Sequence, residues 1–133
     1  MILIVDDLTE QRRIARNRAA AQSLPPKVMD HALALSARER LAHVYPIGVQ
    51  RGAIIGLRAL VADGHRLPKG MPSPRDEAKA SAWADGLAAG MRVPPRAAFG
   101  SEVRREMIAA AYRAGITAGI MATLERAGLV RGT

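Results

Sequence analysis

The residues that could carry out chemistry in this 133-residue sequence are few, and arginine dominates them. The chain has 17 arginines and three lysines, with histidines at positions 31, 43 and 65 and no cysteine. Without cysteine it has no disulfide, no thiolate nucleophile and no cysteine-ligated zinc. The histidines are scattered and lack the spacing of a metal site. The sequence therefore predicts neither a metal ion nor another cofactor.

The acidic residues do not suggest catalysis. They include two adjacent pairs, Asp6/Asp7 and Asp76/Glu77. Neighbouring side chains on a helix or strand point apart, and acids near a helix start are explained by the helix dipole. The chain also has no GxSxG elbow, no P-loop and no GxGxxG motif after a strand. We therefore expect a protein that is not an enzyme.

The charge balance predicts a polyanionic partner. The net charge is +8 and the isoelectric point is about 11.2. Arginine suits this role because its planar guanidinium binds phosphate in a bidentate way. A GC-rich coding bias could explain why arginine replaces lysine, but not why basic residues exceed acidic ones. The residues expected to contact RNA or DNA phosphates are Arg12, Arg13, Arg16, Arg18, Arg92, Arg96, Arg104 and Arg105.

The first predicted helix concentrates this charge. Arg12, Arg13 and Arg16 lie three or four residues apart and so share a face, while Ile14 and Ala15 turn toward the core. Such a face repels itself, which a polyanion would relieve. The alternative is that the acids one turn earlier, or acids elsewhere, neutralise it within the protein.

Aromatic residues are almost absent, with one Trp, two Tyr and one Phe. Single-strand binders stack bases on several exposed aromatic rings, which this chain cannot supply. Strands also favour aromatic and β-branched residues, whereas Ala, Arg, Leu and Met favour helices. The composition therefore predicts an all-α fold.

The breaker and cap signals divide the chain into five or six helices in one domain, 1–133. Asp7, Ser36 and Pro26 mark helix starts, Gly128 marks an end, and Pro46 predicts a kink. Residues 2–5 read as a short apolar arm. The Pro- and Gly-rich stretch 68–74 is the expected linker between halves 1–67 and 75–133. The expected helices are 8–22, 27–35, 37–44, 47–62, 75–89 and 101–127.

An internal repeat relates the two halves. Residues 38–57 align with 105–124 without a gap, with seven identities in twenty positions. A shorter third copy lies between them. The shared pattern is aromatic-x-x-Gly-x-x-x-Gly, and it uses the Trp and both Tyr residues of the chain. Its members are Tyr45, Gly48 and Gly52; Trp83, Gly86 and Gly90; and Tyr112, Gly115 and Gly119.

On a helix, this spacing places two glycines and an aromatic ring on one face. Glycine within a helix costs roughly 1 kcal/mol relative to alanine, so the missing side chains must serve a purpose. Close helix packing is one explanation and predicts that Tyr45 and Tyr112 are buried. The alternative is a slot for an extended ligand or a nucleic-acid backbone, with Arg51 and Arg113 beside it.

Residues 80–119 resemble the ribosome modulation factor family and its phage-encoded relatives. The resemblance rests on Trp83-Ala-Asp-Gly86-Leu-Ala-Ala-Gly90, Pro94 in a loop, Arg104/Arg105 and Tyr112-Arg-Ala-Gly115. The family's loop usually reads Cys-Pro-Tyr or Asn-Pro-Tyr where this chain has Val93-Pro94-Pro95. Its second helix usually has a tryptophan pair where this chain has Tyr112 alone. The resemblance implies binding to ribosomal RNA on the small subunit.

We therefore expect a small basic RNA- or ribosome-associated regulator. The alternative is a protein-binding module, such as a phage-type inhibitor or adaptor that docks a host protein through apolar, glycine-rich helix faces. The longest uncharged run, Ala114–Leu124, is too short to span a membrane, so we expect a cytoplasmic protein. Self-association is compatible with either function.

Overall fold

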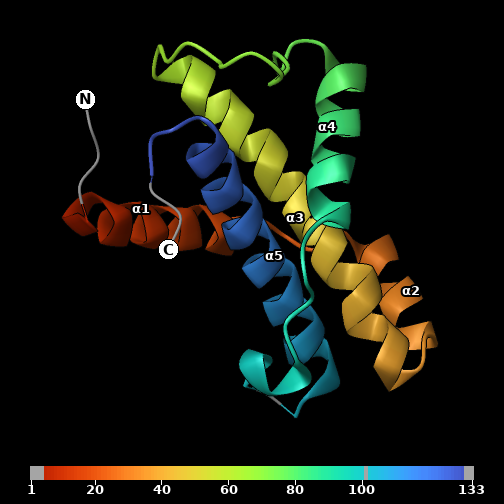
Figure 1. Ribbon diagram of the computed structural model, residues 1–133. Helices are drawn as coiled ribbons and strands as arrows, with labels where there is room; N and C mark the ends of the chain where they lie inside the picture. Colours follow the sequence, from red (N-terminus) through yellow and green to blue (C-terminus); the bar gives the residue numbers. More distant parts are fainter. Residues whose placement is uncertain (1–4, 101, 131–133) are drawn as a thin grey trace.

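The computed structural model describes residues 5–100 and 102–130, and within these ranges the fold is all-α (Figure 1). This confirms the predicted fold class. The described part contains no strand. In order, the elements are α1 (Val5–Ala20), α2 (Pro26–Ala34), α3 (Ala37–Ala62), α4 (Glu77–Ala89), the 3₁₀ helix η1 (Arg96–Phe99) and α5 (Arg104–Arg126).

Several predicted helix ends are confirmed. Pro26 occupies the first position of α2, where its missing N–H is not needed. Ser36 is the N-cap residue of α3, although its hydroxyl donates to Glu39 Oε1 at 2.9 Å instead of accepting from the backbone. The prediction for Asp7 is wrong, because α1 already begins at Val5. Of the predicted apolar arm, residues 2–4 lie outside the described residues.

Two further corrections concern proline and the start of α5. The helices expected at 37–44 and 47–62 are one continuous helix, since α3 runs from Ala37 to Ala62 with Pro46 inside it. Pro46 cannot bond to the carbonyl of Ala42, but Ala42 is exposed, so water can take that place. The last helix begins at Arg104, not at residue 101, because the preceding chain forms η1 and a left-handed turn at Gly100.

Helices α3 and α5 form the centre of the fold and run side by side in the same direction (Figure 1). Their glycines are in register: a Cβ built on Gly48 would lie 2.3 Å from the carbonyl oxygen of Tyr112, and one on Gly115 would lie 2.4 Å from that of Tyr45. Tyr45 and Tyr112 are equivalent in the repeat. The two copies therefore pack on each other about a pseudo-twofold axis.

The other helices surround this pair. Helix α1 packs across α5, α2 contacts both α3 and α5, and α4 packs mainly against α3 (Figure 1). The largest fully buried side chains, among them Leu57, Ile108 and Ile116, come from the central pair. Within the described ranges α5 is long and apolar enough to cross a membrane by length and composition alone. A buried core helix passes the same test, so the result is weak evidence for a membrane span. In α5, 56% of the apolar window is buried inside the protein.

Candidate functional site

The arginines of α1 are exposed, but they do not act as one cluster. Arg13 is paired with Glu10, its Nε–H donating to Oε2 at 3.0 Å, and Glu10 in turn has a lowered pKa because it accepts hydrogen bonds from Arg13. The expected neutralisation by an acid one turn earlier therefore holds for Arg13. Arg12 and Arg16 have no carboxylate partner among the described residues, and Arg16 Nε donates to the Arg12 carbonyl at 3.3 Å.

The predicted orientation of α1 is confirmed by its apolar residues. Ala15 is buried and Ile14 is half-buried, whereas Arg12 and Arg16 face solvent. Arg18 differs from the other arginines of the helix, because it lines a cavity between α1, α3 and α5. Sequence spacing alone could not separate Arg18 from its neighbours.

A second group of arginines lies between α4 and α5. Arg92 and Arg96 are exposed in the connection, and Arg104 and Arg105 are exposed in the first turn of α5. None of the four is ion-paired with a described carboxylate. The positive end of the α5 dipole disfavours cations in this turn, so these two arginines do not serve helix stability.

Arg104 of the second group lies far along α5 from the place where α1 packs. Arg18 and Ile120 line the same cavity, so α1 crosses α5 near Ile120. Arg104 stands sixteen residues earlier on α5, which corresponds to about 24 Å along the helix axis. A partner that touches both Arg104 and α1 must therefore be an extended anion rather than a single phosphate.

The glycine faces of α3 and α5 are occupied by each other. A Cβ on Gly52 would lie 2.1 Å from the carbonyl oxygen of Ile116, and one on Gly119 would lie 2.2 Å from that of Val49. Tyr45 and Tyr112 are 6% and 4% exposed, which confirms their predicted burial. The prediction of a ligand slot on these glycine faces, with Arg51 and Arg113 beside it, is therefore wrong for these two copies, because backbone of the other helix already fills the space.

The third copy of the motif is open. A Cβ added to Gly86 would meet no atom within 4 Å, and one added to Gly90 would meet only carbonyls of its own helix, the nearer at 3.7 Å. Trp83 is half-buried and packs beside Ala53, Ala84 and Leu87. Gly86 and Gly90 therefore lie on an accessible surface of α4.

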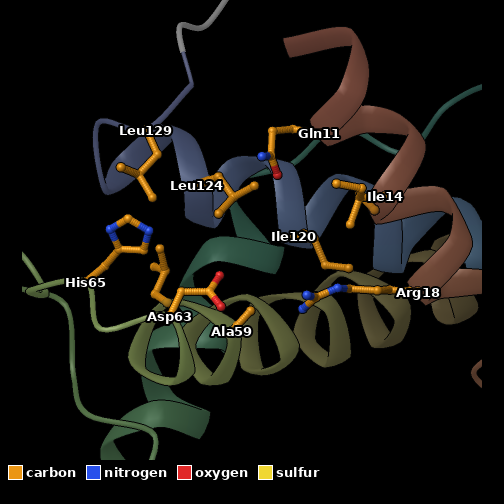
Figure 2. Close-up of a pocket in the computed structure, with 11 residues that line it drawn as sticks. Gln11, Ile14, Arg18, Ala59, Asp63, His65, Ile120, Leu124 and Leu129 are labelled. Carbon is orange, nitrogen blue, oxygen red and sulfur yellow. The ribbon is translucent and has the colours of Figure 1, made fainter. Parts of the chain in front are cut away.

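A cavity of about 300 Å³ lies between α1 and the C-terminal parts of α3 and α5 (Figure 2). Its walls are mostly apolar. Leu60 and Ile120 are almost fully buried there, and Ile14, Leu124 and Leu129 complete the apolar surface. This volume is at the lower end of the range found for small-molecule pockets.

Four polar side chains reach this cavity. They are Gln11 and Arg18 from α1, Asp63 at the C-cap of α3 and His65 just beyond it (Figure 2). None of the four side chains makes a hydrogen bond or ion pair with another described residue. Asp63 and His65 belong to no binding motif in the sequence, because only the tertiary fold brings them to α1.

Two turns of the same type shape this end of the molecule. After α3, Gly64 takes a φ of +76°, and the His65 N–H donates to the Leu60 carbonyl at 2.9 Å. After α5, Gly128 takes a φ of +78°, and the Leu129 N–H donates to the Leu124 carbonyl at 3.0 Å. Both are Schellman motifs, and they bring His65 and Leu129 back toward the cavity.

The histidines do not form a metal site among the described residues. The rings of His31 and His43 lie 4.5 Å apart between α2 and α3. Burial lowers the pKa of His43, and the nearby His31 lowers it further. Beside them the buried Arg40 donates to the Ala32 carbonyl at 3.0 Å and so satisfies the end of α2.

Comparison with known protein families, with curated proteins and with solved structures found no significant match.

Proposed function

We propose that this protein is a small basic RNA-binding regulator that associates with ribosomal RNA through two groups of exposed arginines. The first group is Arg12 and Arg16 on α1. The second is Arg92, Arg96, Arg104 and Arg105 between α4 and the first turn of α5. The observation that carries the proposal is that these side chains are exposed and have no carboxylate partner among the described residues.

The overall charge supports this proposal. The chain carries a net charge of +8, and the ion pairs within the described residues join Arg13 to Glu10 and Lys79 to Asp76. Most of the positive charge is therefore not neutralised by close contacts. When arginines neutralise the phosphates of a nucleic acid, the counterions bound to those phosphates are released. This release favours binding of a polyanion to such a surface.

The first turn of α5 adds a second argument. Arg104 and Arg105 are placed where the helix dipole opposes a positive charge. A phosphate at this turn would be attracted both by the guanidinium groups and by the positive end of the helix. An anionic partner therefore gives a reason for two arginines at a position that stability alone disfavours.

The mode of recognition follows from the aromatic residues. Tyr45, Phe99 and Tyr112 are buried and Trp83 is half-buried. The protein therefore lacks the exposed rings on which single-strand binders stack bases. We propose recognition of the RNA backbone and its shape, with little readout of base sequence. The resemblance of residues 80–119 to the ribosome modulation factor family supports the same class of partner.

The experiment compares pairs of arginines with equal charge. Binding of the full chain to a structured ribosomal RNA fragment is measured by fluorescence anisotropy for R12Q/R16Q, for R104Q/R105Q and for the control R66Q/R75Q. The control removes two exposed arginines between α3 and α4, outside both groups. We expect each test pair to weaken binding about tenfold or more, and the control to weaken it clearly less. Circular dichroism checks that each variant is folded.

Two results would contradict the proposal. Equal losses in all three double variants would show that net charge, not the two groups, determines binding. An absence of RNA binding would leave the protein-docking alternative, for which the open face at Gly86 and Gly90 is the surface to test.

A further inference from the structure

The cavity between α1, α3 and α5 is separate from the arginines proposed to bind RNA. Arg12 and Arg16 face solvent and do not line the cavity, and Arg104 stands sixteen residues before Ile120, about 24 Å along α5. The cavity itself is apolar over most of its surface, with a few polar groups at its edge. That combination is typical of small-molecule sites rather than of phosphate-binding surfaces.

The polar groups include two opposite charges that do not pair. The guanidinium of Arg18 comes from α1 and the carboxylate of Asp63 from the C-cap of α3. Figure 2 shows both side chains reaching into the space beside Ala59 and Ile120. The two charged groups are farther apart than the 4 Å of an ion pair. Each is therefore able to bind an opposite charge on a ligand placed between them.

The helix ends determine which charge goes where. Helices α3 and α5 both end beside the cavity, and Asp63 stands at the end of α3. The negative ends of the two dipoles favour a cation on this side. On the α1 side, Arg18 favours an anion and Ile14 offers an apolar surface. A ligand that suits both sides carries an ammonium and a carboxylate on an apolar body.

We propose that this cavity binds a free α-amino acid with an aliphatic side chain. The ammonium group pairs with Asp63, the carboxylate pairs with Arg18, and the side chain packs against Ile14, Ile120 and Leu124. A volume of about 300 Å³ accommodates a ligand of this size. A fatty acid would leave Asp63 unpaired beside the negative helix ends, and an alkylamine would leave Arg18 unpaired.

The test uses the full chain and L-leucine as the probe. Amide chemical shifts are followed by NMR during titration with L-leucine, with 4-methylpentanoate, which lacks the ammonium, and with 3-methylbutylamine, which lacks the carboxylate. We expect L-leucine to shift resonances around the cavity and to bind about tenfold more tightly than either analogue. D63N and R18Q should each weaken L-leucine binding by a similar factor.

Matched controls separate the cavity from overall charge and from RNA binding. D30N and R12Q change exposed charges outside the cavity and should leave L-leucine binding unchanged. A59L places apolar bulk into the cavity and should abolish binding in a folded protein. The assignment is overturned if L-leucine shifts no cavity resonances, or if both analogues bind as tightly as L-leucine. Neither result depends on RNA affinity.

Discussion

The copies of the aromatic-x-x-Gly-x-x-x-Gly pattern in this protein differ in whether another helix packs on their glycines. In α3 and α5 the glycines bring two backbones into contact, because carbonyl oxygens occupy the places where Cβ atoms would lie. In α4 the corresponding Gly86 faces open space. A glycine motif on a helix therefore indicates a potential for close packing. Whether the packing forms depends on a partner helix that the motif does not specify.

In the α3–α5 pair, as in small-residue helix pairs of membrane proteins, glycines let two helix backbones approach closely. Here the pair lies at the centre of an arginine-rich protein. The pseudo-twofold arrangement explains why both copies need glycine at equivalent positions. Gly48 lies close to the carbonyl oxygen of Tyr112, and Gly115 lies close to that of Tyr45. Close contacts of this kind bring Cα–H groups toward carbonyl oxygens, which adds a small favourable contribution to packing.

The largest expected effect comes from adding a methyl group inside the α3–α5 contact. Gly119→Ala places Cβ 2.2 Å from the Val49 carbonyl oxygen, and Gly52→Ala places it 2.1 Å from that of Ile116. Backbone must move in both cases, so we expect each variant to lose about 1–3 kcal/mol of unfolding free energy. Urea denaturation followed by circular dichroism measures this loss. A change below about 1 kcal/mol would contradict the close packing of α3 on α5.

The matched change in α4, Gly86→Ala, should raise the unfolding free energy instead of lowering it. Gly86→Ala adds a methyl group where no atom lies within 4 Å. Alanine also restricts the unfolded chain more than glycine does, so we expect stabilisation of about 0.5–1 kcal/mol. The same urea experiment measures it. Destabilisation by Gly86→Ala would show that this face is covered in solution, for example by a second copy of the chain.

The smallest expected effect is a pH dependence of the unfolding free energy that comes from His43. Only one copy of the repeat has this histidine, because the equivalent residue in α5 is Ala110. The pKa of His43 is lowered by burial and by His31, so the folded protein binds a proton less readily than the unfolded chain. Unfolding free energy should therefore be constant above the ordinary pKa of 6.5 and fall as the pH decreases through the lowered one. His43→Gln should reduce this fall, which denaturation measured at several pH values would show. If the variant and the wild type had the same pH dependence, the lowered pKa of His43 would be contradicted.

Much of this fold could be predicted from the sequence, because its helix boundaries depend on local signals. Pro26 and Ser36 mark starts that the structure has, and Gly128 marks the end of α5. Pro46 marks no boundary between two helices, because the carbonyl that it leaves without a partner belongs to the exposed Ala42 and can reach water. The repeat identified both halves of the α3–α5 contact, since equivalent positions must carry equally small residues.

The candidate sites were less predictable. Exposure of the arginines followed from their chemistry, but the pairing of Arg13 with Glu10 and the position of Arg18 in a cavity did not follow from helical spacing. Asp63 and His65 gave no signal in the sequence beyond a helix end. They reach the cavity because the turn at Gly64 folds back toward α1, which only the packed structure determines.

In the proposed function, arginine–phosphate contacts bind this protein to RNA, so binding by the wild-type protein should weaken as the salt concentration rises. The association constant for a ribosomal RNA fragment is measured across a range of potassium chloride concentrations. If Arg12, Arg16, Arg104 and Arg105 each neutralise one phosphate, log K should fall linearly with log salt with a slope of about −3 or steeper. In R104Q/R105Q the slope should become shallower by about one unit or more. A slope near zero, or one that R104Q/R105Q leaves unchanged, would contradict the account.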